Sequence, residues 1–130
     1  MREIVAGVLV ATLLSACAKA YATEPNSGNP VHCADAFVYF HIKAKGRGDR
    51  MEAIATMVRG QFELEKAQAA GNSMNEIKAA TLAFDEANHN DPNVMRLLGV
   101  ECRDKQNGDP KWHDYQKRLL AKWKAKERES

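Results

Sequence analysis

Five helix-start signals divide the sequence after residue 28, and they constrain the fold more than any other feature. Three consist of Asn or Asp followed by proline, namely Asn29-Pro30, Asp91-Pro92 and Asp109-Pro110. Such a side chain can accept a hydrogen bond from the unpaired amides of a first helical turn, and proline at the first helical position loses only an N–H without a partner. Two more have the capping-box spacing, namely Asp49 with Glu52 and Ser73 with Glu76. We therefore predict five helices.

Apolar residues follow each start signal at the spacing of an amphipathic helix. The predicted apolar faces are Cys33, Phe37, Phe40 and Ala44; Met51, Ile54, Val58 and Phe62; Ile77, Ala80, Phe84 and Ala87; Val94, Leu97, Leu98 and Cys102; and Trp112, Tyr115, Leu119 and Trp123. No stretch combines β-branched residues with alternation of period two, so we expect no strands. The predicted fold class is all-α, a compact bundle of about five short helices over residues 30–130.

The first 16 residues have the pattern of a cleaved export signal. The mainly apolar residues 4–14 would rise only about 16 Å as a helix, which is too short to span a hydrocarbon core. Residues 14–17, Leu-Ser-Ala-Cys, resemble the lipobox of bacterial lipoproteins, and this resemblance implies diacylglycerol on Cys17 and anchoring to the outer membrane. Ordinary signal cleavage, giving a soluble periplasmic or secreted protein, is the alternative, because residues 18–20 and 20–22 have small-x-small patterns.

Residues 17–29 are polar and have no apolar periodicity. A segment of this composition cannot bury a core, so we predict a flexible polar tether between the export signal and the helical domain.

The cysteines separate into one candidate for lipidation and one pair. If Cys17 is set aside, Cys33 and Cys102 remain, in an exported protein where disulfides can form. Their pairing would close a loop of about 70 residues, worth roughly 4 kcal/mol in the chain-entropy model. Both lie on predicted apolar faces, so we predict a structural disulfide between the first and the fourth helix.

The sequence shows no pattern typical of catalysis or of metal binding. The four histidines do not have ligand spacing, and we expect each to be a surface or partly buried imidazole; they are His32, His41, His89 and His113. The few serines have other roles, and no carboxylate pair can be assigned to a shared cleft. We expect no enzyme, no metal and no cofactor; a small envelope hydrolase is the weakest alternative.

Net charge is +2, from 19 Lys and Arg against 17 Asp and Glu, so no overall field favours nucleic acid. The positive charge is concentrated in the last predicted helix, residues 110–130. This segment could bind an acidic partner or anionic lipid through Trp112, Lys117, Arg118, Lys122, Trp123 and Lys124. The alternative is a packed helix with a solvated lysine face, whose cations suit the negative end of the helix dipole.

The layout resembles that of small periplasmic acid-stress chaperones, which are exported helical domains with one disulfide and a Lys-rich last helix containing a tryptophan. The resemblance implies that acid would loosen the bundle and expose apolar faces to unfolding clients. Our leading expectation is instead a non-enzymatic protein of the cell envelope that binds a partner protein, as an immunity or accessory lipoprotein would. The chaperone is the alternative.

Overall fold

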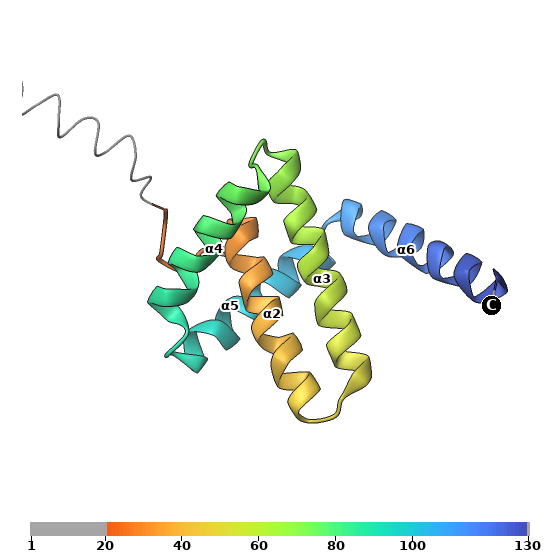
Figure 1. Ribbon diagram of the computed structural model, residues 1–130, viewed down its shortest axis with the longest axis horizontal. Coiled ribbons are helices and arrows are strands. Elements are labelled where there is room, and N and C mark those ends of the chain that lie inside the picture. Colours follow the sequence, from red (N-terminus) through yellow and green to blue (C-terminus); the bar gives the residue numbers. More distant parts are fainter. Residues whose placement is uncertain (1–20, 130) are drawn as a thin grey trace, which may run out of the picture.

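The computed structural model describes residues 21–129 and contains five helices (Figure 1). They are α2 (Pro30–Gly46), α3 (Arg50–Ala69), α4 (Met74–Asn88), α5 (Pro92–Asn107) and α6 (Pro110–Glu129). The described residues contain no strand, so the prediction of an all-α bundle of about five helices is confirmed. The predicted export signal and Cys17 lie outside the described residues, as do the side chains of Trp123 and Lys124.

Each helix begins at one of the predicted signals. The side chains of Asn29, Asp49 and Asp91 accept from the N–H groups of Val31, Glu52 and Val94 at 3.0, 3.1 and 3.2 Å. Ser73 and Glu76 form both halves of a capping box, and Asp109 accepts from the N–H of Lys111 at 2.9 Å. Local hydrogen bonding is therefore sufficient to explain where the helices start.

The central element is α2, which forms an antiparallel hairpin with α3 and also contacts α4 and α5 (Figure 1). Small buried residues recur every seven positions on α3, at Ala53, Gly60 and Ala67. A Cβ atom on Gly60 would lie 3.6 Å from Cβ of Phe37 and 3.8 Å from the Ala34 carbonyl oxygen. This spacing keeps one seam of α3 facing α2 and allows the two backbones to approach closely.

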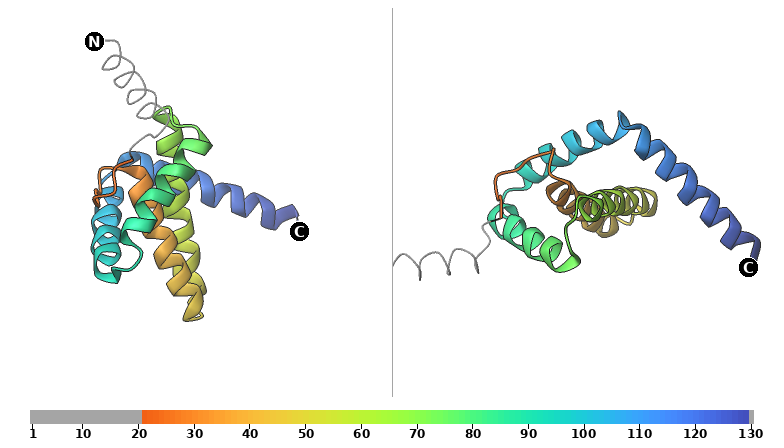
Figure 2. Two further views of the ribbon diagram at one scale, coloured as in Figure 1. Left: turned by 60° about the vertical axis from the view of Figure 1, so that its left-hand side comes forward. Right: turned by 90° about the horizontal axis from the view of Figure 1, so that it is seen from above.

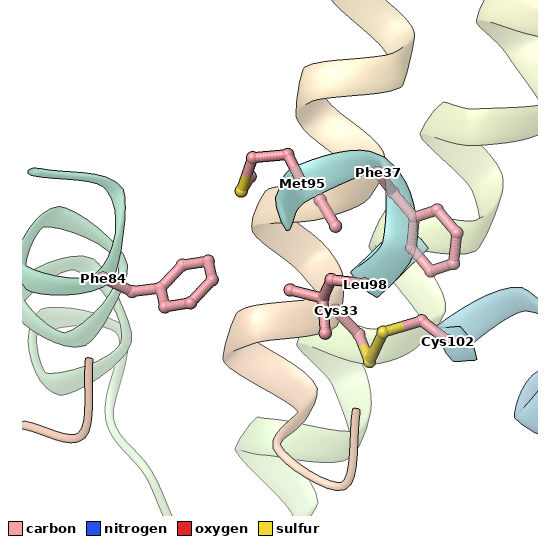
Figure 3. Packing of buried hydrophobic residues seen from close by; sticks show 7 residues of the cluster. Cys33, Phe37, Phe84, Met95, Leu98 and Cys102 are labelled. Atoms are coloured by element: carbon pink, nitrogen blue, oxygen red, sulfur yellow. A yellow bond between two sulfur atoms is a disulfide. The ribbon is translucent and has the colours of Figure 1, made fainter. Parts of the chain in front are cut away.

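The main core lies between α2, α4 and α5 (Figure 3). It consists of buried side chains from all three helices, namely Cys33, Ala36, Phe37, Phe84, Met95, Leu98 and Cys102. Cys33 and Cys102 form the predicted disulfide, with Cα atoms 5.6 Å apart, and thereby link α2 to α5 within the core. The disulfide prediction is confirmed.

The last helix, α6, extends away from the other four (Figures 1 and 2). Its first turns pack on α3, where the ring of Phe62 lies 5.3 Å from those of both Trp112 and Tyr115. Among the α6 residues whose side chains the structure describes, Leu119 is the last that packs against this cluster. The structure therefore attaches α6 through its N-terminal half.

Three residues of the predicted apolar faces, Met51, Ala87 and Leu97, are exposed. Met51 belongs to the first turn of α3, close to the 46–49 connection at the far end of the hairpin. On α5, Met95, Leu98 and Cys102 face the core. Leu97 precedes Leu98 by one residue and therefore lies on a different face of the helix. The predicted helical spacing of apolar residues is thus correct. Which of these residues are buried depends on where the neighbouring helices pack.

Residues 21–29 contain no helix but are hydrogen-bonded to the bundle. The Asn26 N–H donates to Nδ1 of His32 at 3.2 Å, while Nε2 of His32 donates to the Ala22 carbonyl oxygen at 2.9 Å. The Asn88 side chain donates to the Thr23 carbonyl oxygen at 2.8 Å. This part of the predicted tether is therefore attached to α2 and α4. His32 is fully buried, not on the surface, because it holds this segment.

Candidate functional site

An open groove of about 620 Å³ lies between α2, α3 and α4. Its walls are mainly apolar side chains from the three helices, namely Val38 and Ile42 of α2, Met57 and Leu64 of α3, and Met74 and Leu82 of α4. We call it the apolar groove. The sequence analysis did not predict it, because all three helices were expected to bury their apolar faces in one core.

Large apolar side chains are left exposed along this groove. Nine such side chains are exposed in the described part of the chain, and five of them line the groove. These five have 46–63% of their surface accessible and are Val38, Ile42, Met57, Met74 and Leu82. Contiguous exposed apolar surface on a small protein is typical of an interaction site. The two methionines add flexible side chains that adapt to different partners.

Asp35 supplies a buried carboxyl group to the same groove. It is only 7% exposed, and its Oδ2 atom accepts no hydrogen bond from an N–H or hydroxyl donor of the described residues. Burial, the negative charge of Asp85 on α4 and a hydrogen bond with that side chain raise the pKa of Asp35 to about 7. The two acidic side chains therefore form a carboxyl pair that connects α2 to α4 at the groove.

No basic residue of the described chain forms an ion pair with either member of this pair. His41 and Lys78 also line the groove. The ring of His41 is occupied by α3, because its Nδ1 donates to the Ala53 carbonyl oxygen at 2.6 Å. The groove thus combines apolar walls with acidic groups that have no cationic partner among residues 21–129 as described.

The hydroxyl groups that line the groove are engaged in local hydrogen bonds. The two groups donate to the backbone of their own helices, Thr56 to the Glu52 carbonyl at 2.8 Å and Thr81 to the Ile77 carbonyl at 2.7 Å. Within residues 21–129, no group of three His, Cys, Asp or Glu side chains could hold a metal ion.

We predicted an interaction surface on α6, and the members whose side chains are described do not line the apolar groove; they are Trp112, Lys117, Arg118 and Lys122. Trp112 is 2% exposed and packs in the core, with the guanidinium of Arg59 4.9 Å from its ring centroid. Lys117, Arg118 and Lys122 are exposed. Trp112 is therefore a core residue, because α6 uses this face to pack on α3.

A buried polar network supports the packing of α6. Arg59 donates from Nη1 to Oε1 of Gln106 at 2.9 Å, and Nε2 of Gln106 donates to Oε1 of Glu63 at 3.2 Å. Lys66 lies 3.3 Å from the other carboxylate oxygen of Glu63. Burial raises the pKa of Glu63, although Lys66 and Gln106 act against this shift. These contacts connect α3 to α5 beneath Trp112.

The described chain is thus a disulfide-linked helical bundle with one mainly apolar groove and a protruding last helix. Comparisons with protein-family models, with curated proteins and with solved structures found no match. None of the helices within residues 21–129 has the length and hydropathy required to cross a bilayer.

The sequence contained one signal for the carboxyl pair that we did not use. Asp35 stands inside the apolar stretch Cys-Ala-Asp-Ala-Phe of the first helix, where a charge is unusual. Its partner, Asp85, lies 50 positions later on another helix. Only the packing of α4 against α2 brings the two carboxyl groups together.

Proposed function

We propose that this protein is a non-enzymatic binding protein of the cell envelope and that the apolar groove holds a segment of a partner protein. The observation that carries the proposal is the concentration of exposed apolar side chains in one groove. The export signal and lipobox pattern of residues 1–17 support a periplasmic location, with an outer-membrane anchor on Cys17. An immunity or accessory lipoprotein would function in this way.

The groove has the dimensions for a short helix of the partner. Along α4, the wall from Met74 to Asp85 is about 16 Å long at the rise of an α-helix, or about three turns. An amphipathic helix that enters such a groove presents apolar residues at positions i, i+3, i+4 and i+7. The walls formed by Ile42, Met57 and Leu82 would pack against that face.

Photo-crosslinking in intact cells tests this proposal. A photoreactive residue placed at Leu82 should give one discrete adduct of fixed 1:1 stoichiometry, and the additional substitution Ile42→Glu should remove it. The matched control position is Leu97 on α5, which is exposed to a similar extent but lies outside the groove. Absence of an adduct at Leu82, or the same adduct from Leu97, would overturn the proposal.

The acid-stress chaperone is the second candidate, because an open apolar groove could also hold unfolded segments. Protonation of Asp35 and Glu63 favours the folded state, since burial raises the pKa of both groups, and this opposes unfolding by acid. Aggregation of a client enzyme at pH 2–3 distinguishes the two candidates. Protection by the wild type that is lost in Ile42→Lys, whose added charge persists at this pH, would replace the first proposal by the second.

A further inference from the structure

We propose that Asp35 and Asp85 anchor a single lysine or arginine side chain, carried on the apolar face of the partner helix that occupies the groove. This inference rests on the proposed function and specifies the chemistry of the partner. It predicts that the groove selects amphipathic segments by one positive charge in addition to their apolar residues.

The first argument is the unsatisfied carboxyl group of Asp35. Its Oδ2 atom is buried and accepts from no N–H or hydroxyl donor of the described residues. Once Asp35 ionises, the proton of its hydrogen bond with Asp85 is lost, and the buried carboxylate oxygen lacks the donor that such atoms nearly always have. Asp35 also lines a groove that is open to solvent-borne ligands. Because Oδ2 itself is closed to solvent, the side chains that cover it would have to move for a donor group of a ligand to complete its hydrogen bonding.

The second argument is the repulsion between the two carboxyl groups. Asp35 and Asp85 come from different helices and would both be negative at alkaline pH, with no basic side chain of the described chain paired to them. One cation placed between them would interact favourably with both. An ammonium or guanidinium group also supplies several N–H donors for the free carboxylate oxygens.

The third argument is the apolar surface around the pair. Val38 and Leu82, which are both exposed, line the groove together with the pair. A free polyamine or metal ion would leave this apolar surface uncovered. A cation attached to an apolar helix face would cover it, so the geometry favours a protein segment over a small cation.

Binding should depend on pH because only an ionised Asp35 attracts the cation. The charged and titratable groups that share the groove with Asp35 are Asp85, His41 and Lys78. Protonation of Asp35 below its raised pKa of about 7 removes one negative charge from the anchor. Affinity for a cationic segment should therefore fall as the pH decreases from 8 to 6. The Asp35→Asn variant separates this effect from those of the other groups that line the groove.

Three synthetic amphipathic helices of 15 residues, differing at one central position of the apolar face, test the proposal. The position carries lysine, norleucine or glutamate, and affinity for the full-length protein is measured calorimetrically at pH 6, 7 and 8. At pH 8 the lysine peptide should bind about tenfold more tightly than the norleucine peptide. This preference should disappear in Asp35→Asn, shrink at pH 6 and persist in the control Leu97→Glu. The variant Ile42→Glu should bind neither the lysine nor the norleucine peptide.

Equal affinity for the lysine and norleucine peptides would overturn the charge anchor and leave the binding function intact. Binding of neither peptide would also overturn the anchor, and the crosslinking experiment would then decide the proposed function separately. If circular dichroism shows that Asp35→Asn is unfolded, the half-buried Asp85→Asn replaces it. A second copy could also provide a basic helix, α6. Concentration-dependent dimers that the lysine peptide dissociates would identify that copy as the occupant and overturn the assignment to a partner protein.

Discussion

The imidazole of His32 stacks on the ring of Phe84, with centroids 4.1 Å apart and planes inclined by 17°. The contact joins α2 to α4 at the place where both helices hold residues 21–29. Because Nδ1 accepts a hydrogen bond and Nε2 donates one, the imidazole is neutral and carries its proton on Nε2. His32 is 1% exposed, and this burial lowers its pKa.

Acid should release the N-terminal segment from the bundle. The neutral form of His32 stabilises the fold fully above the unfolded-state pKa of about 6.5, and this stability decreases as the pH falls below that value. Protonation at Nδ1 also removes the acceptor for the Asn26 N–H. We expect hydrogen exchange at the Asn26 amide, corrected for its intrinsic pH dependence, to show less protection at pH 5 than at pH 7.

The control for this effect is His113→Gln, which changes an exposed histidine on α6 and should leave Asn26 exchange unaltered. His32→Gln should remove the pH dependence of Asn26 protection. A titration of the His32 ring by NMR that gives a pKa above the ordinary value would contradict the prediction.

Asp35→Asn should stabilise the protein at alkaline pH. The folded-state pKa of Asp35, about 7, lies above its unfolded value, so the group stabilises the fold at low pH and this contribution is lost as the pH rises through 7. Asp35 should therefore make the wild type more resistant to urea at pH 5 than at pH 8 by up to a few kcal/mol, while His32 acts against this difference. In Asp35→Asn the difference in urea resistance between pH 5 and pH 8 should be smaller. The exposed control on α5, Asp104→Asn, should keep the wild-type difference. Lower stability of Asp35→Asn than of the wild type at pH 8 would refute this account.

Removal of the disulfide should destabilise the bundle strongly. Cys33 and Cys102 are 69 positions apart, and a closed loop of this length stabilises a fold by roughly 4 kcal/mol in the chain-entropy model. We expect the double variant Cys33→Ser, Cys102→Ser to lose a comparable free energy of unfolding in urea. Cys17→Ser, outside the described residues, should have the stability of the wild type, and similar losses in both variants would argue against a structural role for the disulfide.

Gly99→Ala should strain the contact between α5 and α2. A Cβ atom at this buried position would collide with the ring of Phe40, so the ring or the helix must move. We expect a loss of about 1–3 kcal/mol in the free energy of unfolding. The additional substitution Phe40→Leu should recover part of this loss in a double-mutant cycle.

Gly46→Ala is the matched control for this prediction, because no atom lies within 4 Å of the Cβ that it introduces. Unchanged stability of Gly99→Ala, or an equal loss in both alanine variants, would contradict the proposed collision.

Local signals in the sequence were sufficient for the helix starts and for the disulfide. Asn29, Ser73 and Asp91 interact with amides two or three residues away, so their role does not depend on the rest of the fold. The disulfide could be predicted because only two cysteines remain when Cys17 is set aside, and both lie on predicted apolar helix faces. The bundle could therefore be predicted, but its interaction surface could not.

Periodicity alone could not show which apolar side chains would remain uncovered. Trp112 stood both on a predicted apolar face and among the candidate interaction residues, and it is buried, whereas Ile42 and Leu82 are exposed in the groove. Likewise, the Asp35–Asp85 pair depends on how α4 packs against α2. The sequence by itself determined the helices, the residues at which they start and the cysteine pair, because these depend on short-range hydrogen bonds and spacing. Only the tertiary structure decided the groove and its carboxyl pair, because both form between side chains that are distant in sequence and are brought together by helix packing.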